Sequence, residues 1–362
     1  MKAISIETGS KSYPVFVDSH SLEHLNVFLK ENFPSLTKLL IITDETVERL
    51  HLSTLLKYVS SYHPVSYTVP SGELAKTFDV YYQCLTYSLQ EKLDRHSVIL
   101  ALGGGAVGDL AGFVAATYMR GIPFIQIPTT ILAHDSAVGG KVAINHPSGK
   151  NMIGAFYQPE AVFYHIDFLK SLPINEKRSG FAEAIKHALI SDEALYDWMR
   201  LNLLTLDSIP EETLISILTR GIEIKGEIVA QDEKETGVRA FLNFGHTLGH
   251  AIEAEMGYGN MTHGEAVVIG MHFALRLSQK VSDLSFQLVE CNRWLRKLGY
   301  DIKVPEHLQI NRLVDRMKQD KKAYGQKLRF VLLEKVGRPT IVELEEEFVI
   351  KELEMFMNGG EC

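Results

Sequence analysis

Three short segments in the second half of the chain carry side chains that suit a metal ion. His246 and His250 are four residues apart, so both lie on one face if this segment is helical. Glu183 and His263 lie on two other predicted helices. Two imidazole nitrogens and a carboxylate oxygen, with a coordination position left open, form a ligand set typical of a catalytic zinc ion. The glutamate of the H-E-x-x-H protease motif is absent, so zinc-protease chemistry is not expected.

The same residues also have simpler interpretations. Glu183 and Lys186 are three residues apart and could form an ordinary ion pair on a helix surface. His187 follows directly and has equally suitable spacing for a ligand. A single histidine in a helix is more often structural than metal-bound. Spacing alone therefore leaves a metal site and a purely structural role both open.

A glycine-rich loop in the first half of the chain fits a phosphate site. It follows an apolar run at 97–102, precedes a predicted helix and matches G-x-G-x-x-G, reading Gly103-Gly104-Gly105-Ala106-Val107-Gly108-Asp109. Such glycines let the backbone approach a pyrophosphate, and the helix N-terminus supplies N–H donors. A tight strand-to-helix turn without a ligand is the alternative. The usual acidic residue about 20 positions downstream is missing. Asp44 and Glu73 are the remaining candidates for a ribose contact, although each could equally be a helix cap.

The segment after this loop is rich in groups that bind anions. Thr129 and Thr130 follow a predicted strand, where their hydroxyls can meet phosphate or ribose. Lys141 follows a Gly-Gly pair, and Lys150 and Asn151 follow another glycine. Surface lysines are usually only solvated, but lysines presented by glycine-rich loops of an acidic protein are better anion ligands. We therefore expect a small, strongly anionic substrate.

These residues need a scaffold, and hydrophobic periodicity predicts one with two parts. Apolar runs at 38–43, 65–69, 97–102 and 124–127 read as strands, with helical spacing at 46–60 and 77–93 between them. Alternating strands and helices predict a parallel sheet covered on both faces. Beyond residue 173 the pattern becomes mostly helical, with helices expected at 176–203, 211–231, 246–256, 263–279, 284–298 and 311–317, and a hairpin at 328–342. The predicted fold is an α/β N-terminal Rossmann-like parallel-sheet domain over residues 1–170, followed by a mostly α-helical C-terminal domain over residues 171–362.

Composition restricts the class of protein. The 362 residues include 46% hydrophobic and 23% charged residues with a formal net charge of -8, which excludes collagen-like, disulfide-scaffold and strongly disordered chains. The acidic balance argues against nucleic-acid and anionic-membrane binding. Three scattered cysteines favour a reducing compartment. The first residues lack the pattern of a signal peptide, and no apolar run suits a membrane span. We expect a cytoplasmic enzyme that binds neither nucleic acid nor membrane.

Taken together, the motifs resemble those of the 3-dehydroquinate synthase family of sugar-phosphate cyclases. The resemblance covers most of the chain and rests on SGELAK, GGGAVGDLAGFVAATYMRG, PTT, DSAVGGK, GKNMIGAF, FAEAIKH, LNFGHTLGHAIE, HGEAV and DKK. It implies conversion of 3-deoxy-arabino-heptulosonate 7-phosphate to 3-dehydroquinate and phosphate, in the shikimate pathway of aromatic amino-acid biosynthesis. The implied steps are transient oxidation by NAD, phosphate elimination, reduction and intramolecular aldol closure. Another sugar-phosphate cyclase and a metal-dependent NAD polyol dehydrogenase are the alternatives.

The resemblance also implies roles for individual residues. The metal, zinc or cobalt, would be held by Glu183, His246 and His263. Catalytic roles fall to Lys141, His250 and Glu235, the last two in proton transfer. Contacts to NAD fall to Asp44, Ser71, Gly72, Glu73, Leu74, Ala75, Lys76, Gly104, Gly105, Ala106, Val107, Gly108, Asp109, Thr129, Thr130, Lys141, Lys150, Phe168, Leu169, Lys170 and Ser171.

A third group of residues would bind the substrate. Its carboxylate and phosphate would be met by Lys141, Asn151, Lys186, Lys225, Arg239, Asn243 and one of Lys321 and Lys322, and Arg120 and Asp135 are further substrate-binding residues. In the family the residue corresponding to Arg120 reaches the site of a neighbouring subunit, so a homodimer is implied. The loop before Asp135 is one residue shorter here than is usual in the family.

Overall fold

The computed structural model describes residues 3–257, 259–320 and 327–359. The chain forms two compact units, Met1–Pro173 with Glu211–Lys234, and Ile174–Pro210 with Glu235–Cys362. The first boundary between these units falls after residue 173, close to the division expected at residues 170 and 171, and residues 211–234 return to the first unit. There the helix α9 (Glu211–Gln231) packs on the first two strands. Its helical periodicity was visible in the sequence, but its packing partner was not.

The first unit contains a seven-stranded sheet. Its strands, in spatial order, are β1 (Ile4–Glu7), β2 (Ser12–Asp18), β9 (Ala161–His165), β6 (Phe124–Pro128), β5 (Val98–Gly103), β3 (Leu39–Asp44) and β4 (Val65–Val69). All neighbouring pairs are parallel except β1 and β2, which are antiparallel. The predicted parallel sheet is thus present, but it is a mixed sheet with an antiparallel edge. That edge was missed because β1 and β2 are joined by a short turn instead of a crossover helix.

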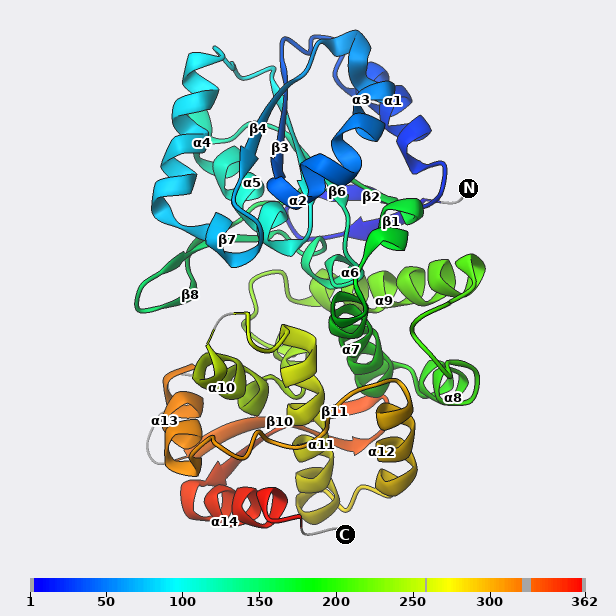
Figure 1. Cartoon of the computed structure of the whole chain (residues 1–362), viewed down its shortest axis with the longest axis vertical. Helices are drawn as coiled ribbons and strands as arrows, with labels where there is room; N and C mark the ends of the chain where they lie inside the picture. Colours follow the sequence, from blue (N-terminus) through cyan, green and yellow to red (C-terminus); the bar gives the residue numbers. More distant parts are fainter. Residues whose placement is uncertain (1–2, 258, 321–326, 360–362) are drawn as a thin grey trace. The chain divides into compact units, whose positions relative to one another are not determined.

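Both faces of this sheet are covered, as β3 illustrates. All of its residues are buried. Leu40 and Ile42 belong to the core on the side of α4 (Phe78–Gln90) and α5 (Gly105–Thr117), whereas Leu39 and Ile41 belong to the core on the side of α1 (Ser21–Asn32) and α3 (Ser53–Val59). Figure 1 shows these helices on opposite sides of the strands. A strand buried on both faces reads as a continuous apolar run, which is why KLLIIT was recognisable in the sequence.

The remaining elements of the first unit connect these strands. They are α1 (Ser21–Asn32), α2 (Glu45–Val47), η1 (Glu48–Leu52), α3 (Ser53–Val59), η2 (Ser60–Tyr62), η3 (Gly72–Lys76), α4 (Phe78–Gln90), α5 (Gly105–Thr117), η4 (Tyr118–Arg120), α6 (Ala133–Ser136), the hairpin β7 (Lys141–His146) with β8 (Gly149–Phe156), and η5 (Ile166–Ser171). The single helix predicted at 46–60 is interrupted by a π-helical turn, η1.

The strand order creates a switch point between β3 and β5. From β3 the chain passes to β4 on one side and then returns to place β5 on the other side. In open α/β sheets, ligands bind beyond the carboxyl ends of the strands at such a point. Asp44 is the last residue of β3, and Gly103 is the last residue of β5. The topology therefore puts two of the predicted nucleotide-binding segments beside each other.

The second unit is largely helical, as the sequence pattern predicted. Its elements are α7 (Ile174–Ser191), α8 (Glu193–Asn202), η6 (Val238–Asn243), α10 (His246–Met256), α11 (His263–Val281), α12 (Leu288–Lys297), α13 (Ile310–Asp320), the hairpin β10 (Lys327–Lys335) with β11 (Arg338–Glu345), and α14 (Glu346–Met357). The helix predicted at 176–203 is two helices, because Asp192 interrupts it and caps α8 through the N–H of Leu195 at 2.9 Å. No helix in the described ranges has the length and apolar character needed to cross a membrane.

Glycines allow α10 and α11 to lie unusually close to each other. Gly245 precedes α10 with a φ of 80°, a conformation that favours glycine. A Cβ atom at Gly270 of α11 would lie 1.9 Å from the carbonyl oxygen of Gly245, and one at Gly249 would lie 3.1 Å from the backbone of Val267. Any side chain at Gly270 would therefore force the two helices apart.

We expect Gly270→Ala to destabilise the protein by about 1–3 kcal/mol, because the added methyl group meets backbone that cannot move alone. Gly226→Ala on α9 is the matched control. The atom nearest to its new Cβ is the flexible Cδ1 of Ile6, so its effect should be small. Urea unfolding followed by circular dichroism measures both variants. Equal midpoints for the two would show that the α10–α11 contact is not a tight constraint.

Candidate functional site

Three histidines of the second unit converge at the beginning of α10 and α11. His246 is the first residue of α10, His250 follows one turn later, and His263 is the first residue of α11. One ring nitrogen of each lies within 4.8 Å of those of the others. The ring centroids of His246 and His263 are 5.3 Å apart, and those of His246 and His250 are 5.0 Å apart. The helix spacing seen in the sequence thus places these imidazoles around one point.

The carboxylate of Glu183 reaches the same point from α7. Its Oε1 lies 3.6 Å from Nε2 of His246 and 3.4 Å from Nε2 of His263. Its side chain is only 1% exposed. The ammonium of Lys186, equally buried and one turn further along α7, contacts the other carboxylate oxygen. The ion pair considered from the sequence is therefore present, but it lies in the interior and adjoins the histidines.

His246 and His263 direct Nε2 toward Glu183 because Nδ1, on the other side of each ring, lies at hydrogen-bond distance from an acceptor. Nδ1 of His246 lies 3.1 Å from the carbonyl oxygen of Phe244, and Nδ1 of His263 lies 3.1 Å from Oε2 of Glu253. When Nδ1–H donates these bonds, the Nε2 lone pair is available for a metal ion. Such outer partners are typical of metal-binding histidines.

Glu253 was missed by the sequence analysis. A usable signal existed, because residues 246, 250 and 253 have the i, i+4, i+7 spacing of one helix face. Its partner His263, however, lies on the next helix, and only the tertiary structure pairs the two side chains. Glu253 has 12% of its side chain exposed.

The electrostatic environment distinguishes the two histidines next to Glu183. Burial, reinforced by the Lys186 ammonium, holds the pKa of His246 well below its ordinary value, so its imidazole is neutral. Burial also lowers the pKa of His263, but the carboxylates of Glu183 and Glu253 outweigh this and raise it to about 9. A divalent cation would replace that proton, since metal binding requires neutral imidazoles. The donor set of one carboxylate and two imidazoles fits zinc or a similar ion.

The segment that leads into α10 carries further predicted residues. The side-chain N–H of Asn243 donates to Oε1 of Glu235 at 3.0 Å. Glu235 has a φ of 58°, a left-handed backbone conformation uncommon outside glycine. The guanidinium of Arg239 belongs to one of the largest fully buried side chains, at 1% exposure. A buried cation and a held carboxylate are thus both present in the second unit.

In the first unit, the glycine loop joins β5 to α5 as the motif requires. Gly104 precedes the first turn of α5. A Cβ atom at Gly104 would lie 2.9 Å from Cγ2 of Thr130, and one at Gly108 would lie 2.7 Å from Oε1 of Gln126. These glycines are therefore needed for packing whether or not a phosphate binds. The tight-turn interpretation and the phosphate interpretation do not exclude each other.

Buried hydroxyl groups near this loop lack intramolecular hydrogen bonds. The Oγ1 atoms of Thr43, Thr129 and Thr130 are buried and have no hydrogen-bond partner among the described residues. Thr43 belongs to β3, and the other two follow the end of β6. The backbone N–H of Thr129 donates to the carbonyl of Gly103 at 3.0 Å, which ties this segment to the glycine loop. Because buried hydroxyls are normally paired, these groups fit the phosphate and ribose oxygens of a dinucleotide.

Asp44 acts as the helix cap that the sequence left open as an alternative. Its Oδ1 accepts the N–H of Thr46 at 2.9 Å, the N–H of Val47 at 3.0 Å and the hydroxyl of Ser71 at 3.0 Å. The cap joins the end of β3 to the loop that contains η3. Residues 71–76 are thereby anchored at the switch point of the sheet.

Most of the predicted polar residues of η3 and the β7–β8 hairpin contact one another. Nζ of the buried Lys76 donates to Oδ2 of Asp109 at 2.6 Å and also contacts Asn151. Glu73 accepts the side-chain N–H of Asn145 at 2.7 Å and has Lys150 at 3.7 Å. Leu74 lies exposed, whereas Ala75 is buried. The fold thus brings together three segments that the sequence linked only through the family resemblance.

Other predicted residues of the first unit lie elsewhere. Lys225 on α9 has Nζ 3.1 Å from Oδ1 of Asp135 on α6. Lys141 begins β7 and Arg120 ends η4, both exposed.

The predicted 168–171 segment forms part of η5. Phe168 and Leu169 are buried there, Lys170 is exposed and 2.5 Å from Asp167, and Ser171 meets Nε2 of His51 at 2.9 Å. Lys321 and Lys322 lie outside the described residues.

We expect His246→Ala to abolish zinc binding, since it removes a central nitrogen ligand. His250→Ala is the matched control and should retain the ion, because the ligand set that we expect consists of Glu183, His246 and His263. Atomic absorption after dialysis against dilute zinc measures the bound metal. Stoichiometric zinc in the His246 variant would contradict the ligand assignment, and loss from both variants would make His250 a ligand as well.

Glu253→Gln should weaken zinc binding by about 10–100-fold without removing the site, because His263 loses its carboxylate partner but keeps Nε2. Competition with a chromogenic chelator gives the affinity. A Glu255→Gln variant is the control, since Glu255 is bound instead by Arg312 and Arg316. An unchanged affinity in the Glu253 variant would show that this carboxylate does not orient the ligand.

The chain is similar to known proteins over nearly its whole length. Residues 66–179 match the sequence family described as 3-dehydroquinate synthase N-terminal, and residues 180–323 match 3-dehydroquinate synthase C-terminal. A 3-dehydroquinate synthase of Bacillus cereus (strain AH820) is 54% identical over 357 residues, covering 98% of this chain and 99% of the relative.

Solved structures show the same fold. A 2-deoxy-scyllo-inosose synthase, crystallised with carbaglucose-6-phosphate, NAD+ and Co2+, superposes with a TM-score of 0.90 at 24% identity, covering 98% of this chain and all of the other. A 2-epi-5-epi-valiolone synthase of Streptomyces hygroscopicus subsp. jinggangensis 5008, with NAD+ and Zn2+ bound, gives 0.85 at 22% identity with full coverage of both chains. At these identities the likeness concerns the fold alone. The family matches and the 54% identity over nearly the whole chain establish that it belongs to the 3-dehydroquinate synthase family.

Proposed function

We propose that this chain converts 3-deoxy-arabino-heptulosonate 7-phosphate to 3-dehydroquinate and phosphate, with NAD and a divalent metal ion as cofactors. Family membership supports the reaction. The observation that carries the proposal is the convergence of Glu183, His246 and His263 within one helical unit. A phosphate-eliminating cyclase needs such a site, because its substrate must be oxidised transiently at a hydroxyl carbon.

The three converging residues would hold zinc or cobalt. Bound there, the ion would act as a Lewis acid that lowers the pKa of the substrate hydroxyls coordinated to it. Glu183 contributes negative charge to the site, and Phe244 and Glu253 keep the imidazoles oriented. The relatives that were crystallised with Co2+ and with Zn2+ make either ion a reasonable choice.

NAD would bind at the carboxyl edge of the sheet in the first unit. There it would accept a hydride and return it later in the same turnover, so that no net reduction occurs. The N-terminus of α5 offers backbone N–H groups to the pyrophosphate. The hydroxyls of Thr43, Thr129 and Thr130 would obtain the partners that they lack among the described residues. Asp44 keeps the adjoining loop in place.

Buried cations would meet the anionic groups of the substrate. Lys186 and Arg239 are each about 1% exposed, and Lys225 is 6% exposed. Charge–charge attraction is stronger at sites of low dielectric than in water, so such groups hold a phosphate or carboxylate effectively. They also stabilise the charge that grows on the phosphate as its bond to carbon breaks. Lys141, Lys150, Asn151 and Asn243 would add hydrogen bonds and positive charge.

Proton transfers would fall to His250 and Glu235. His250 carries a half-buried imidazole, a group whose ring nitrogens can accept and donate protons. Glu235 is held by Asn243, which keeps its carboxylate in one place. We further propose a cytoplasmic homodimer in which the exposed Arg120 reaches the neighbouring subunit; its exposure and its left-handed backbone, with a φ of 70°, support that role.

The decisive assay follows phosphate and 3-dehydroquinate with NAD present in catalytic amount. One phosphate should be released per heptulosonate phosphate consumed, with no lasting absorbance from NADH. A polyol dehydrogenase would accumulate NADH without releasing phosphate. A cyclase for another sugar phosphate would leave the heptulosonate phosphate unchanged. Dialysis against a chelator should abolish turnover, and added zinc or cobalt should restore it.

A further inference from the structure

The second unit contains a large pocket that none of the proposed cofactor or substrate residues line. Its volume is about 920 Å³, and its walls come from α11, α12, the segment after α12 and the end of α14. We propose that this pocket binds a small organic molecule that carries a phosphate group. The proposal does not depend on the reaction proposed above.

The walls of the pocket are strongly cationic. They include Arg276, Arg293, Arg296, Lys297 and Lys303, whereas none of the described residues that line it is acidic. The chain as a whole carries a formal net charge of -8. Five basic side chains around one concave site are therefore a local departure from the charge of the protein. Arginines suit phosphate in particular, because the guanidinium can donate two parallel hydrogen bonds to it.

Most of these cations have no carboxylate partner in the part of the chain that the structure describes. Within the described ranges, no carboxylate lies at ion-pair distance from Arg293, Arg296, Lys297 or Lys303. Arg276 differs, since its Nε lies 3.7 Å from Oε2 of Glu352. That carboxylate also accepts two hydrogen bonds from Lys280, at 2.6 and 2.7 Å, so it is shared between two cations. An anion in the pocket would supply the missing counter-charge.

The deeper part of the pocket combines apolar walls with an incomplete hydrogen-bond network. Leu288, Ile302 and Phe356 supply the apolar surface. The side-chain N–H of Asn292 lies 3.0 Å from Nε2 of His272, whose Nδ1 lies 3.3 Å from the carbonyl of Ile302. The Oδ1 atom of Asn292 is buried and has no partner among the described residues. Buried amide oxygens are normally paired, so a ligand donor at this point would complete the network.

The pKa of His272 is sensitive to the positive charges that line the pocket. Burial is the main reason why its pKa is lowered to about 4, and the charges of Arg276 and Arg296 lower it further. His272 is therefore neutral at physiological pH and adds no charge of its own. The walls combine fixed cations, a neutral polar pair and apolar surface, which matches a phosphate ester better than a bare inorganic anion.

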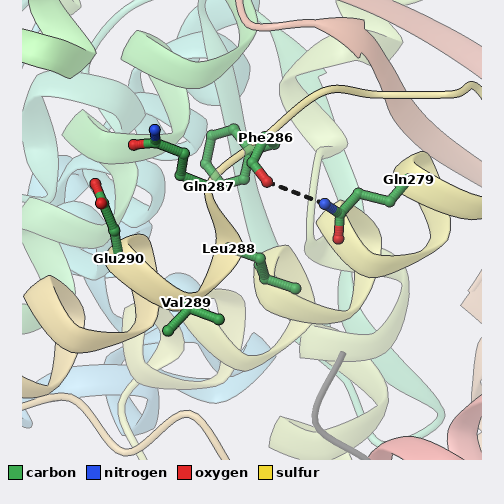
Figure 2. Close-up of a pocket in the computed structure, with 6 residues that line it drawn as sticks. All are labelled: Gln279, Phe286, Gln287, Leu288, Val289 and Glu290. Carbon is green, nitrogen blue, oxygen red and sulfur yellow. Dashed lines mark hydrogen bonds between the residues drawn. The ribbon is translucent and has the colours of Figure 1, made fainter.

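A smaller neighbouring pocket provides an internal comparison. It measures about 360 Å³ and shares Leu288 and Val289 with the larger one. Figure 2 shows its walls, where the side-chain amide of Gln279 donates to the carbonyl of Phe286 at 3.0 Å. None of the described residues that line it is cationic, and one of them is Glu290. An anion would thus be attracted to the larger pocket and not to this one.

The pocket is separate from the proposed metal ligands. His272 and Arg276 lie nine and thirteen residues beyond His263 on the same helix. At 1.5 Å of rise per residue this places them about 14–20 Å along the axis of α11. A ligand in the pocket would therefore occupy a second site, distinct from the one built around Glu183.

The test compares binding of phenyl phosphate to three proteins by isothermal titration calorimetry. These are the full chain, the double variant Arg293→Gln with Arg296→Gln, and the control Arg329→Gln with Arg338→Gln on the exposed side of the β10–β11 hairpin, which loses the same charge in the same unit. The full chain and the control should show one more binding site than the pocket variant. All three should have the same melting temperature and the same basal turnover, because the altered arginines are surface residues outside the reaction site.

Two further probes define the class of ligand. Inorganic phosphate should bind the pocket about tenfold more weakly than phenyl phosphate, because it makes no apolar contact. Benzoate should also bind more weakly, because a carboxylate offers fewer acceptors. Equal site numbers in the full chain and the pocket variant would overturn the proposed site. Equal affinity for phenyl phosphate and inorganic phosphate, or for phenyl phosphate and benzoate, would overturn the proposed ligand class.

Discussion

The burial of the Glu183 carboxylate is the constraint on which the candidate metal site of the second unit depends. An ionised carboxylate at 1% exposure costs several kcal/mol unless cations and hydrogen bonds compensate for it. Lys186 supplies one positive charge from the same helix, and the raised pKa of His263 supplies another when no metal is bound. A divalent cation would satisfy the same carboxylate more completely. The buried Glu183 carboxylate is therefore stable in this position only because neighbouring cations compensate for its charge.

This arrangement requires three helices to be held with little freedom. Glu183 comes from α7, His246 from α10 and His263 from α11. The contact of Gly270 with Gly245 fixes the distance between α10 and α11, and the backbone of Ser179 on α7 packs where a Cβ atom of Gly264 would otherwise lie. Close backbone contacts of this kind are rigid because no flexible side chain intervenes. The glycines near the histidines therefore serve the site without touching a ligand.

In the first unit, close backbone packing likewise positions polar groups, here at the carboxyl edge of the sheet. Its sheet ends in a row of polar groups at the switch point, where the Asp44 cap and the glycine loop meet. Close packing fills the space behind the loop, while the hydroxyls of Thr43, Thr129 and Thr130 have no hydrogen-bond partner among the residues that the structure describes. A folded protein tolerates such groups best where a ligand completes their hydrogen bonds. In the basic pocket between α11, α12 and α14, a bound anion would play a comparable role by supplying counter-charge to the cationic side chains.

Local patterns in the sequence predicted many of the elements and the kinds of chemistry to look for. The helices at 211–231 and 246–256 were predicted to the residue, and residue types and spacing indicated the candidate metal, glycine-loop and lysine segments, whose roles stay predictions. Only the tertiary structure decided that α9 belongs to the first unit, that β1 pairs antiparallel with β2, and that Glu253 supports His263. The physical reason is the distance along the chain over which each kind of interaction acts. Periodicity and capping act over one or two turns of chain, whereas these contacts join segments whose meeting depends on how whole faces pack.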